Sequence, residues 1–492
     1  MDLYLFNSLT NSLGKFDHDK SVPIKWYTCG PTIYSSAHLG HARTFTSFNI
    51  IRRILTYLGY TIIYVMNITD IDDKIINKVK ALNNDVMNRD IYMQFISKME
   101  TEFFNDMDKL NVLRPTVVTR VTEYIDKIIK YIEQMESNGL TYVVNGTVYI
   151  DSQIYLNKGY DWDIFHRASD TDYTECDFVD EKKHKRDFSL WKASKPGEIN
   201  FPSPWGLGRP SWHIECSVMS ENIFGKEIHI HSGGVDLIYP HHANEIIQSI
   251  AHQNCNKNPI QYFLHSGHLN INGEKMAKSL NNFITIDDFL THHTARQLRL
   301  LFLLHKWDKF MDFTDDVVTE IKTIEKKITT FYANVAYLNR TFKNVNSYGE
   351  NDQQYLTLVI QMKKDILVAL YNNMDTRTMM LIILEMINKT FKYVTGDYNL
   401  SFVNDMVNHM TEILNVVGVT FNNIDMIDNS DKYIDIIVSM REEVRKIIKS
   451  NTLIPKTVTK DLFTLLDQVR DVQLKPNGIM IEDGDKPKWT KI

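Results

Sequence analysis

Cysteine is scarce in this sequence. The 492 residues include only Cys29, Cys176, Cys216 and Cys255, which are too few for a disulfide framework in so long a chain. Each cysteine is therefore a small buried side chain, a free thiol, or a metal ligand in a reducing compartment. The sequence around each cysteine has to decide among these roles.

Long apolar runs are also missing. No uninterrupted stretch approaches the roughly 20 apolar residues that span a bilayer. Residues 1–20 contain an early acid, no arginine and no sustained apolar segment, which argues against a targeting peptide. We expect a cytoplasmic protein that makes no contact with a membrane.

A surplus of basic charge is absent too, because the formal net charge is −6. This excludes a uniformly basic surface, but local basic clusters, such as the one in residues 181–188, still allow contact with nucleic acid. With 43% hydrophobic and 24% charged residues, the composition is that of a soluble globular protein. A chain of this length makes roughly two to four domains.

The first part of the chain alternates between strand and helix patterns. Residues 24–34 are rich in β-formers and end in a Gly-Pro turn, residues 43–60 form an amphipathic helix pattern stopped by Gly59, and residues 61–73 form an apolar strand closed by acids. This order predicts an α/β fold with a parallel sheet of the Rossmann type.

The middle of the chain interrupts that fold. Residues 75–139 are mostly helical in pattern, and Asn145-Gly146 between two alternating runs predicts a hairpin within an α+β insertion. Residues 195–210 are rich in Pro, Gly and Trp, after which residues 228–240 resume a strand that ends in glycines. We expect the first fold to continue there.

After about Phe313 glycine becomes scarce, and long stretches of Ile, Leu, Lys and Glu show helical spacing. We predict an all-helical domain in this region. A short, more irregular tail is expected from about Ile427 onward.

The stretch "HLGH" contains two histidines three residues apart, His38 and His41, where a strand gives way to a helix. Both face one ligand above the helix N-terminus, where negative charge is favoured, and Gly40 leaves room for a nucleotide to approach. The alternative is a pair of ordinary surface histidines.

A second candidate is "NGEKMAKSLNNF", residues 272–283. Lys275 and Lys278 lie three residues apart on a loop, where they can reach a triphosphate and offset the charge that develops on pyrophosphate. A solvated lysine loop is the alternative.

Four side chains suit a metal. Cys29 follows the first strand, Cys216 lies in "WHIECS", and His241 and Glu245 in "PHHANE" lie on one helical face. Two thiolates, an imidazole and a carboxylate make a reasonable tetrahedral zinc set. Cys176 and Cys255 have no paired ligand nearby and are interpreted as structural or free thiols.

Five motifs occur together and in order: "CGPTIY…HLGHARTF", "NITDIDDKI", "RPSWHIECS", "IHSGGVDLIYPHHANE" and "KMAKSLNNFITI". In this the chain resembles the cysteinyl-tRNA synthetases of class I, from Leu5 to Trp489, with weaker similarity after about Thr314.

The resemblance implies roles for individual residues. The HIGH-type and KMSKS-type motifs, which hold ATP with Mg²⁺, correspond here to the catalytic residues His38, His41, Lys275 and Lys278, with Gly40 and Lys278 as ATP contacts. The zinc ligands correspond to Cys29, Cys216, His241 and Glu245. The cysteine pocket corresponds to Gly30, Thr69, Trp212, His231 and Asp236.

The resemblance also implies a reaction. Cysteine and ATP form cysteinyl-adenylate, and the cysteinyl group then passes to tRNA(Cys), while zinc selects the cysteine thiolate over serine without an editing site. A monomer is expected.

The implied domains follow the chain. They are a Rossmann catalytic domain in two halves (1–115 and 201–265), a connective insertion (116–200), a KMSKS-loop and stem-contact region (266–313), a helical anticodon-stem domain (314–426) and a C-terminal anticodon-binding region (427–492). Trp489 is expected to stack on an anticodon base.

Three alternatives remain open. A ligase that passes cysteine to a small amine predicts a truncated C-terminal half. A catalytically silent tRNA-binding paralogue is suggested by Ala277, which replaces the usual serine of the KMSKS-type motif and is expected to lower the rate at most. A zinc hydrolase is disfavoured because the sequence has no H-E-x-x-H helix.

Overall fold

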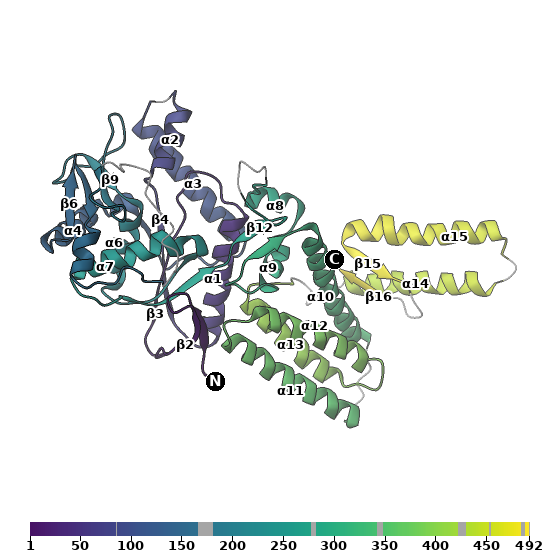
Figure 1. The fold of residues 1–492 in the computed structure, drawn as a ribbon. Coiled ribbons are helices and arrows are strands. Elements are labelled where there is room, and N and C mark those ends of the chain that lie inside the picture. Colours follow the sequence, from purple (N-terminus) through teal and green to yellow (C-terminus); the bar gives the residue numbers. More distant parts are fainter. Residues whose placement is uncertain are drawn as a thin grey trace. The chain divides into compact units, whose positions relative to one another are not determined.

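The computed structural model describes residues 1–84, 86–165, 181–276, 282–341, 348–421, 430–451, 454–483 and 488–491. The chain divides into two compact units (Figure 1). The first comprises residues 1–318, 368–377 and 416–418, and the second comprises residues 319–367, 378–415 and 419–492.

The first unit is built on a five-stranded parallel sheet. Its strands are β3 (Ile24–Thr28), β4 (Ile62–Ile68), β5 (Val117–Arg120), β10 (Ile228–Gly234) and β11 (Ile260–Ser266). They lie in the order β11-β10-β3-β4-β5, so the direction of winding reverses between β3 and β10. In open sheets of this kind, ligands bind at the carboxyl ends of the strands beside that reversal. The predicted Rossmann-type fold is confirmed.

Helices cover both faces of this sheet (Figure 1). On one face, Phe48 of α1 (Leu39–Tyr57) packs against Trp26 of β3, with ring centroids 6.2 Å apart. On the other face, α4 (Ile125–Ser137), α6 (Trp212–Phe224) and α7 (Ala243–Gln253) join the neighbouring Tyr27 in one hydrophobic core. Successive residues of a strand point to opposite faces, so β3 serves both layers.

The predicted elements of the first fold are present. The helix pattern of residues 43–60 corresponds to α1, which starts earlier than predicted and ends before Gly59. The mostly helical stretch contains α2 (Asp73–Leu82), α3 (Arg89–Lys109) and α4, but it also contains β5. This four-residue edge strand is too short to give a clear alternating pattern.

The insertion contains a four-stranded antiparallel sheet in the order β6-β7-β8-β9. Its strands are β6 (Thr141–Val144), β7 (Thr147–Ile150), β8 (Ser189–Ala193) and β9 (Gly208–Pro210), and α5 (Ser152–Asn157) follows β7. The predicted hairpin is confirmed, because Asn145 and Gly146 join β6 to β7 with φ values of 49° and 82°. Two successive positive φ angles are those of the tight hairpin turn that Asn-Gly favours.

Smaller elements complete the first unit. They are the hairpin β1 (Tyr4–Asn7) and β2 (Ser12–Lys15), the sheet of β12 (Leu269–Ile271), β13 (Glu274–Lys275) and β14 (Met311–Phe313), and the helices α8 (Ile286–His292) and α9 (Ala295–Leu303). The predicted division of the chain into six ranges stays a prediction, because the structure separates only two compact units. Its boundary at 115/116 falls just before β5, which pairs with β4 in the parallel sheet.

The second unit is mainly helical, as predicted. Its helices are α10 (Asp315–Thr341), α11 (Glu350–Tyr371), α12 (Thr376–Tyr393), α13 (Leu400–Val416), α14 (Ser430–Ser450) and α15 (Lys456–Gln468), followed by β15 (Ile479–Glu482) and β16 (Lys488–Lys491). None of the helices in the described parts of the chain is long and apolar enough to cross a membrane.

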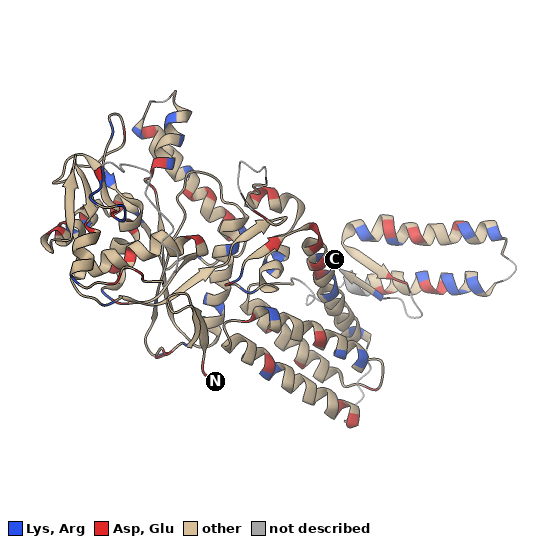
Figure 2. Ribbon diagram, viewed as in Figure 1, with Lys and Arg blue, Asp and Glu red and all other residues tan. Residues whose placement is uncertain are grey.

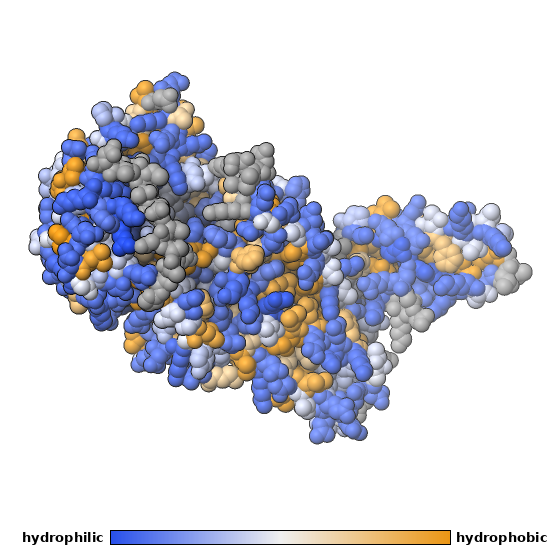
Figure 3. Space-filling view, in the orientation of Figure 1, coloured by the Kyte–Doolittle hydropathy of each residue, from blue (hydrophilic) through white to orange (hydrophobic). Residues whose placement is uncertain are grey.

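The predicted irregular tail is wrong, because α14 and α15 are long regular helices. Ile434 and Val438 of α14 are buried at helical spacing, but many lysines and acids between the apolar positions hide this pattern in the sequence. Other apolar side chains of these helices are exposed, among them Ile436, Met440 and Leu465. Figure 3 shows apolar residues among hydrophilic ones on the surface of this pair of helices.

Trp489 is not available to stack on an RNA base. Only 3% of the residue is exposed, and it packs with Ile434, Val438 and Ile481 in a small core. Its indole N–H donates to Asp435 Oδ1 at 2.6 Å, and the Arg340 guanidinium lies 4.2 Å from the ring centroid. The expected stacking role of Trp489 is therefore wrong, and this side chain anchors the C-terminal hairpin.

We expect Trp489→Ala to destabilise the C-terminal hairpin locally by about 3 kcal/mol or more, because it removes a buried ring and its hydrogen bond. Hydrogen exchange of the α14 amides in the full chain measures this loss as reduced protection. Ile436→Ala is the matched control, because 54% of Ile436 is exposed and its truncation should cost less than about 0.5 kcal/mol. Unchanged protection in Trp489→Ala would contradict the anchoring role.

Candidate functional site

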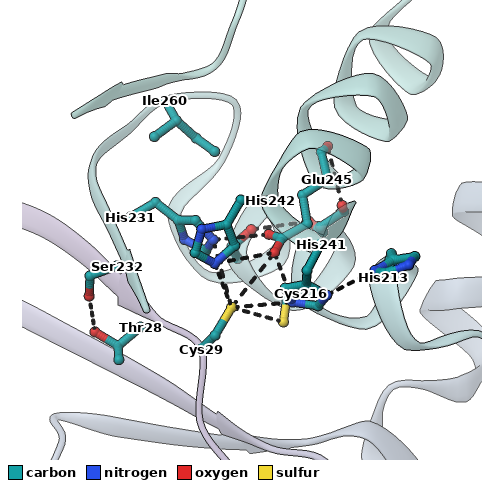
Figure 4. Close-up of polar contacts among 12 residues, drawn as sticks. Thr28, Cys29, His213, Cys216, His231, Ser232, His241, His242, Glu245 and Ile260 are labelled. Carbon is teal, nitrogen blue, oxygen red and sulfur yellow. Dashed lines mark hydrogen bonds and ion pairs between the residues drawn. The ribbon is translucent and has the colours of Figure 1, made fainter. Parts of the chain in front are cut away.

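Four donor side chains from three segments meet at the carboxyl end of the sheet (Figure 4). Cys29 directly follows β3, Cys216 lies in α6, and His241 and Glu245 lie just before and within the first turn of α7. All four are buried, with exposed fractions between 1% and 5%. They are the four residues that the sequence predicted as zinc ligands.

The distances among these atoms fit one small cation. Cys29 Sγ lies 3.5 Å from Cys216 Sγ and 3.5 Å from His241 Nε2, and Glu245 Oε1 lies 3.0 Å from His241 Nε2. A tetrahedral site with metal–sulfur bonds of about 2.3 Å and metal–nitrogen bonds of about 2.0 Å has its ligand atoms roughly 3.3 to 3.8 Å apart. The geometry and the donor types therefore suit a divalent metal.

The cluster contains a second, overlapping donor set. His242 Nε2 and His231 Nε2 lie 3.4 Å and 3.7 Å from Cys29 Sγ, so Cys29, His231, His242 and Glu245 also bring one ligand atom each within 4.8 Å of one another. Burial by itself does not separate the two sets, since all of their members are buried.

Charge in the cluster also favours a cation. Burial, and then the neighbouring Cys216 and Glu245, raise the pKa of the Cys29 thiol well above its usual range. Burial opposes ionisation of Glu245 as well, but His231 and His241 outweigh it and lower the pKa of that carboxyl to about 2. Glu245 therefore stays ionised in this buried cluster, and a bound metal ion would compensate its charge and stabilise the neighbouring thiols as thiolates.

A second layer of side chains orients the donors. His213 Nδ1 lies 2.9 Å from His241 Nδ1, and His231 Nε2 lies 3.1 Å from Glu245 Oε2. On the other side, His242 Nδ1 lies 2.7 Å from His265 Nε2. The sequence predicted no role for His213, His242 or His265. His213 and His242 stand inside motifs singled out in the sequence, but spacing alone does not show which of several neighbouring histidines contacts the cluster.

A pocket of about 360 Å³ opens beside the cluster at the carboxyl ends of the strands. Ten of the predicted site residues line it, namely Cys29, Gly30, His38, Gly40, His41, Thr69, Trp212, Cys216, Asp236 and His241. His231 and Glu245 do not line it, because both are buried behind the other donors. Lys275 ends β13, whereas its side chain, Ala277 and Lys278 fall outside what the structure describes.

The two histidines of "HLGH" form the start of α1. His38 caps the helix, since its Nδ1 accepts a hydrogen bond from Gly40 N at 3.0 Å, and its ring stacks on His41 with centroids 3.9 Å apart. A Cβ on Gly40 would lie 2.8 Å from the His38 ring. The space beside Gly40 is thus filled by imidazole, and glycine is needed there for the cap as well as for the pocket wall.

A chain of hydrogen bonds holds the opposite wall. Gly30 N donates to Asn67 Oδ1 at 2.8 Å, Asn67 Nδ2 donates to Thr69 Oγ1 at 3.3 Å, and Thr69 Oγ1 donates to Glu215 Oε2 at 2.8 Å. A Cβ on Gly30 would lie 1.7 Å from Asn67 O, so only glycine fits there. Trp212 stacks on His241, with centroids 4.5 Å apart, and links this wall to the metal cluster.

Comparison with known proteins agrees with this arrangement. Residues 15–323 match the family of class I (C) tRNA synthetase catalytic domains. The chain is 39% identical to the cysteine–tRNA ligase of Encephalitozoon cuniculi (strain GB-M1), over 98% of each chain. This chain belongs to the cysteine–tRNA ligase family of class I synthetases.

Other relatives extend the comparison. The family's cytoplasmic cysteine–tRNA ligase from Dictyostelium discoideum is 37% identical over 98% of this chain and 76% of that protein. The structure of Mycobacterium tuberculosis methionyl-tRNA synthetase with methionyl-adenylate covers 85% of this chain and 94% of that one, with 14% identity and a TM-score of 0.59. At that identity the likeness concerns the fold alone.

The catalytic-domain match includes every residue of the donor cluster and the pocket. Cys255 also falls inside the match, but it is an exposed free thiol, in line with its predicted lack of a metal role. Cys176 lies outside the described residues.

His41 should make stability depend on pH. Burial, and then the neighbouring His38, lower the pKa of His41 to about 3. Between pH 3 and pH 6.5, His41 is therefore protonated in the unfolded chain but neutral in the folded one. Its contribution to folding stability is fully present above pH 6.5 and is lost as the pH falls. We expect the wild type to lose about 1 to 2 kcal/mol relative to His41→Asn between pH 7 and pH 5. Urea unfolding of both proteins at several pH values measures this, and parallel curves would contradict it.

Proposed function

We propose that this chain ligates L-cysteine to tRNA(Cys), with ATP as co-substrate and cysteinyl-adenylate as intermediate. One observation carries the proposal: a single pocket has the buried Cys29–Cys216–His241 cluster in one wall and the "HLGH" start of α1 in another. A thiol recognised by a metal and a nucleotide held at a helix N-terminus are thereby brought together.

We assign zinc to Cys29, Cys216, His241 and Glu245. Three of these four side chains line the pocket, whereas neither His231 nor His242 does, so only the first set presents a metal to a substrate. His231 then hydrogen-bonds to Glu245 and orients it, a usual role for a histidine behind a metal ligand. When bound, zinc stabilises the thiolate of cysteine, and a serine hydroxyl is a poor ligand at neutral pH.

We assign the ATP side of the site to the start of α1 and to the lysine motif of residues 275–278. His41 is neutral, and with His38 and the backbone of Gly40 it surrounds the helix N-terminus, where phosphate charge is stabilised. Lys275 and Lys278 are proposed to offset charge on the departing pyrophosphate, with Mg²⁺ on the phosphates. Ala277 removes a hydroxyl from this motif but neither lysine, so we expect a lower rate at most.

The cysteine side is formed by Gly30, Thr69, Trp212 and Asp236. Thr69 and Asp236 offer a hydroxyl and a carboxylate to the substrate ammonium, and Trp212 covers His241. The substrate carboxylate is left facing the nucleotide and attacks its α-phosphate. A terminal ribose hydroxyl of the tRNA then attacks the carbonyl of cysteinyl-adenylate, takes the cysteinyl group and releases AMP.

The long second unit favours tRNA over a small amine as acceptor. A small-amine ligase predicted a truncated C-terminal half, yet this chain spans 98% of the Encephalitozoon enzyme and carries helices α10 to α15. We propose that residues 314–426 contact the anticodon stem and residues 427–492 the anticodon. The protein is proposed to be cytoplasmic, since several relatives are named cytoplasmic. We also propose that it acts as a monomer.

Cysteine-dependent ATP–pyrophosphate exchange tests the activation step. We expect exchange with cysteine, none with serine, and loss of exchange after zinc removal by a chelator, with recovery on adding zinc. Equal exchange with serine would contradict thiolate selection. Bound zinc without any exchange would favour the silent paralogue.

A pair of cysteine variants tests the metal assignment. Cys216→Ala removes a proposed ligand and should lower both the zinc content and the exchange rate at least tenfold, because removing a ligand leaves an incomplete site. Cys255→Ala, at an exposed free thiol, is the matched control and should keep both. Metal analysis of the purified proteins reads out the first effect directly, and full zinc content in Cys216→Ala would favour the second donor set.

A further inference from the structure

We propose that Lys74 binds the phosphodiester before the 3′-terminal nucleotide of the tRNA at the mouth of the pocket. The proposal rests on the proposed function and adds a residue for its second step. Among the described residues that line the pocket, Lys74 is the only lysine or arginine. It lies in the first turn of α2, directly after the carboxyl end of β4.

The acids next to Lys74 are engaged elsewhere. Asp70 accepts hydrogen bonds from the backbone and side chain of Thr122, and Asp72 caps α2 by accepting from the backbone N–H of Lys74 at 2.8 Å. Asp73 forms ion pairs with Arg209 and Lys192. The carboxylates of the motif "TDIDDK" are therefore all engaged by groups other than the Lys74 ammonium.

The Lys74 ammonium is held without being neutralised. It lies 5.3 Å from the centroid of the Tyr34 ring, and the side chain is exposed. Within the described parts of the chain it has no ion pair. A π face positions a cation and leaves its charge for an anion. Figure 2 shows both acidic and basic residues along α2.

The place of Lys74 in the pocket favours RNA as the source of that anion. Cysteine is small and belongs beside the buried Cys29 cluster, and the phosphates of ATP belong at the start of α1. Lys74 instead shares the rim with Tyr34 and Trp212, of which Trp212 is 39% exposed. The tRNA is the substrate that has to enter through this mouth, and its single-stranded 3′ end carries one phosphate per nucleotide.

The test measures binding of two RNAs to the zinc-loaded full chain, namely complete tRNA(Cys) and a transcript lacking the 3′-terminal adenosine and its phosphate. We expect Lys74→Gln to weaken binding of the complete tRNA about tenfold and to lower the slope of log affinity against log salt by about 0.7. The same variant should bind the shortened tRNA as the wild type does. Lys74→Arg should restore binding of the complete tRNA.

Lys78→Gln is the matched control, because it removes the same charge from the same helix at an exposed position that does not line the pocket. Equal weakening for both RNAs, or equal weakening by Lys78→Gln, would overturn the proposal. Pyrophosphate exchange without tRNA tests whether Lys74 binds a phosphate of ATP instead. A tenfold loss of exchange in Lys74→Gln would mean that Lys74 serves the nucleotide, and this result would also overturn the proposal. Absent exchange in the wild type would instead count against the proposed function.

Discussion

The burial of two thiols and a carboxylate beside the β3–β10 reversal constrains this structure most. Cys29, Cys216 and Glu245 are buried within hydrogen-bonding distance of imidazoles, next to the pocket that the two cysteines line. Such a group is costly to bury unless a cation compensates it. The histidines partly do so for Glu245, whose pKa falls to about 2, but the pKa of Cys29 stays raised. The donor types and distances of this cluster suit a metal ion.

The sheet topology places that cluster next to a second kind of site. Because the strand order reverses between β3 and β10, the loop after β3 leads both to Cys29 and to the start of α1. Gly30 allows the loop to pass against the backbone of β4, and Asn67 and Thr69 tie it to α6 through Glu215. The loop after β3 thus places Cys29 and the start of α1 beside the same pocket, only a few residues of chain apart.

Sequence reasoning failed where burial decides the role of a side chain. Trp489 near the end of a polar segment looks like an exposed aromatic, yet Asp435 and a small apolar core enclose it. His231 stands in a motif attributed to the cysteine pocket, yet it lies behind Glu245. Lys74 lies within the motif "NITDIDDKI", and only the contacts of the acids beside it reveal that its charge is not compensated.

The sequence by itself determined the Rossmann-type order of elements, the four donors and the family, because these depend on local periodicity and on motifs that keep their spacing. The i,i+4 relation of His241 and Glu245 is one such local feature, and it yields a direct contact. Only the tertiary structure decided which donors face the pocket and that β5 joins the sheet. Those properties depend on packing between segments far apart in the chain. Neither the spacing of residues nor the composition shows which side chains face the pocket and which are buried behind others.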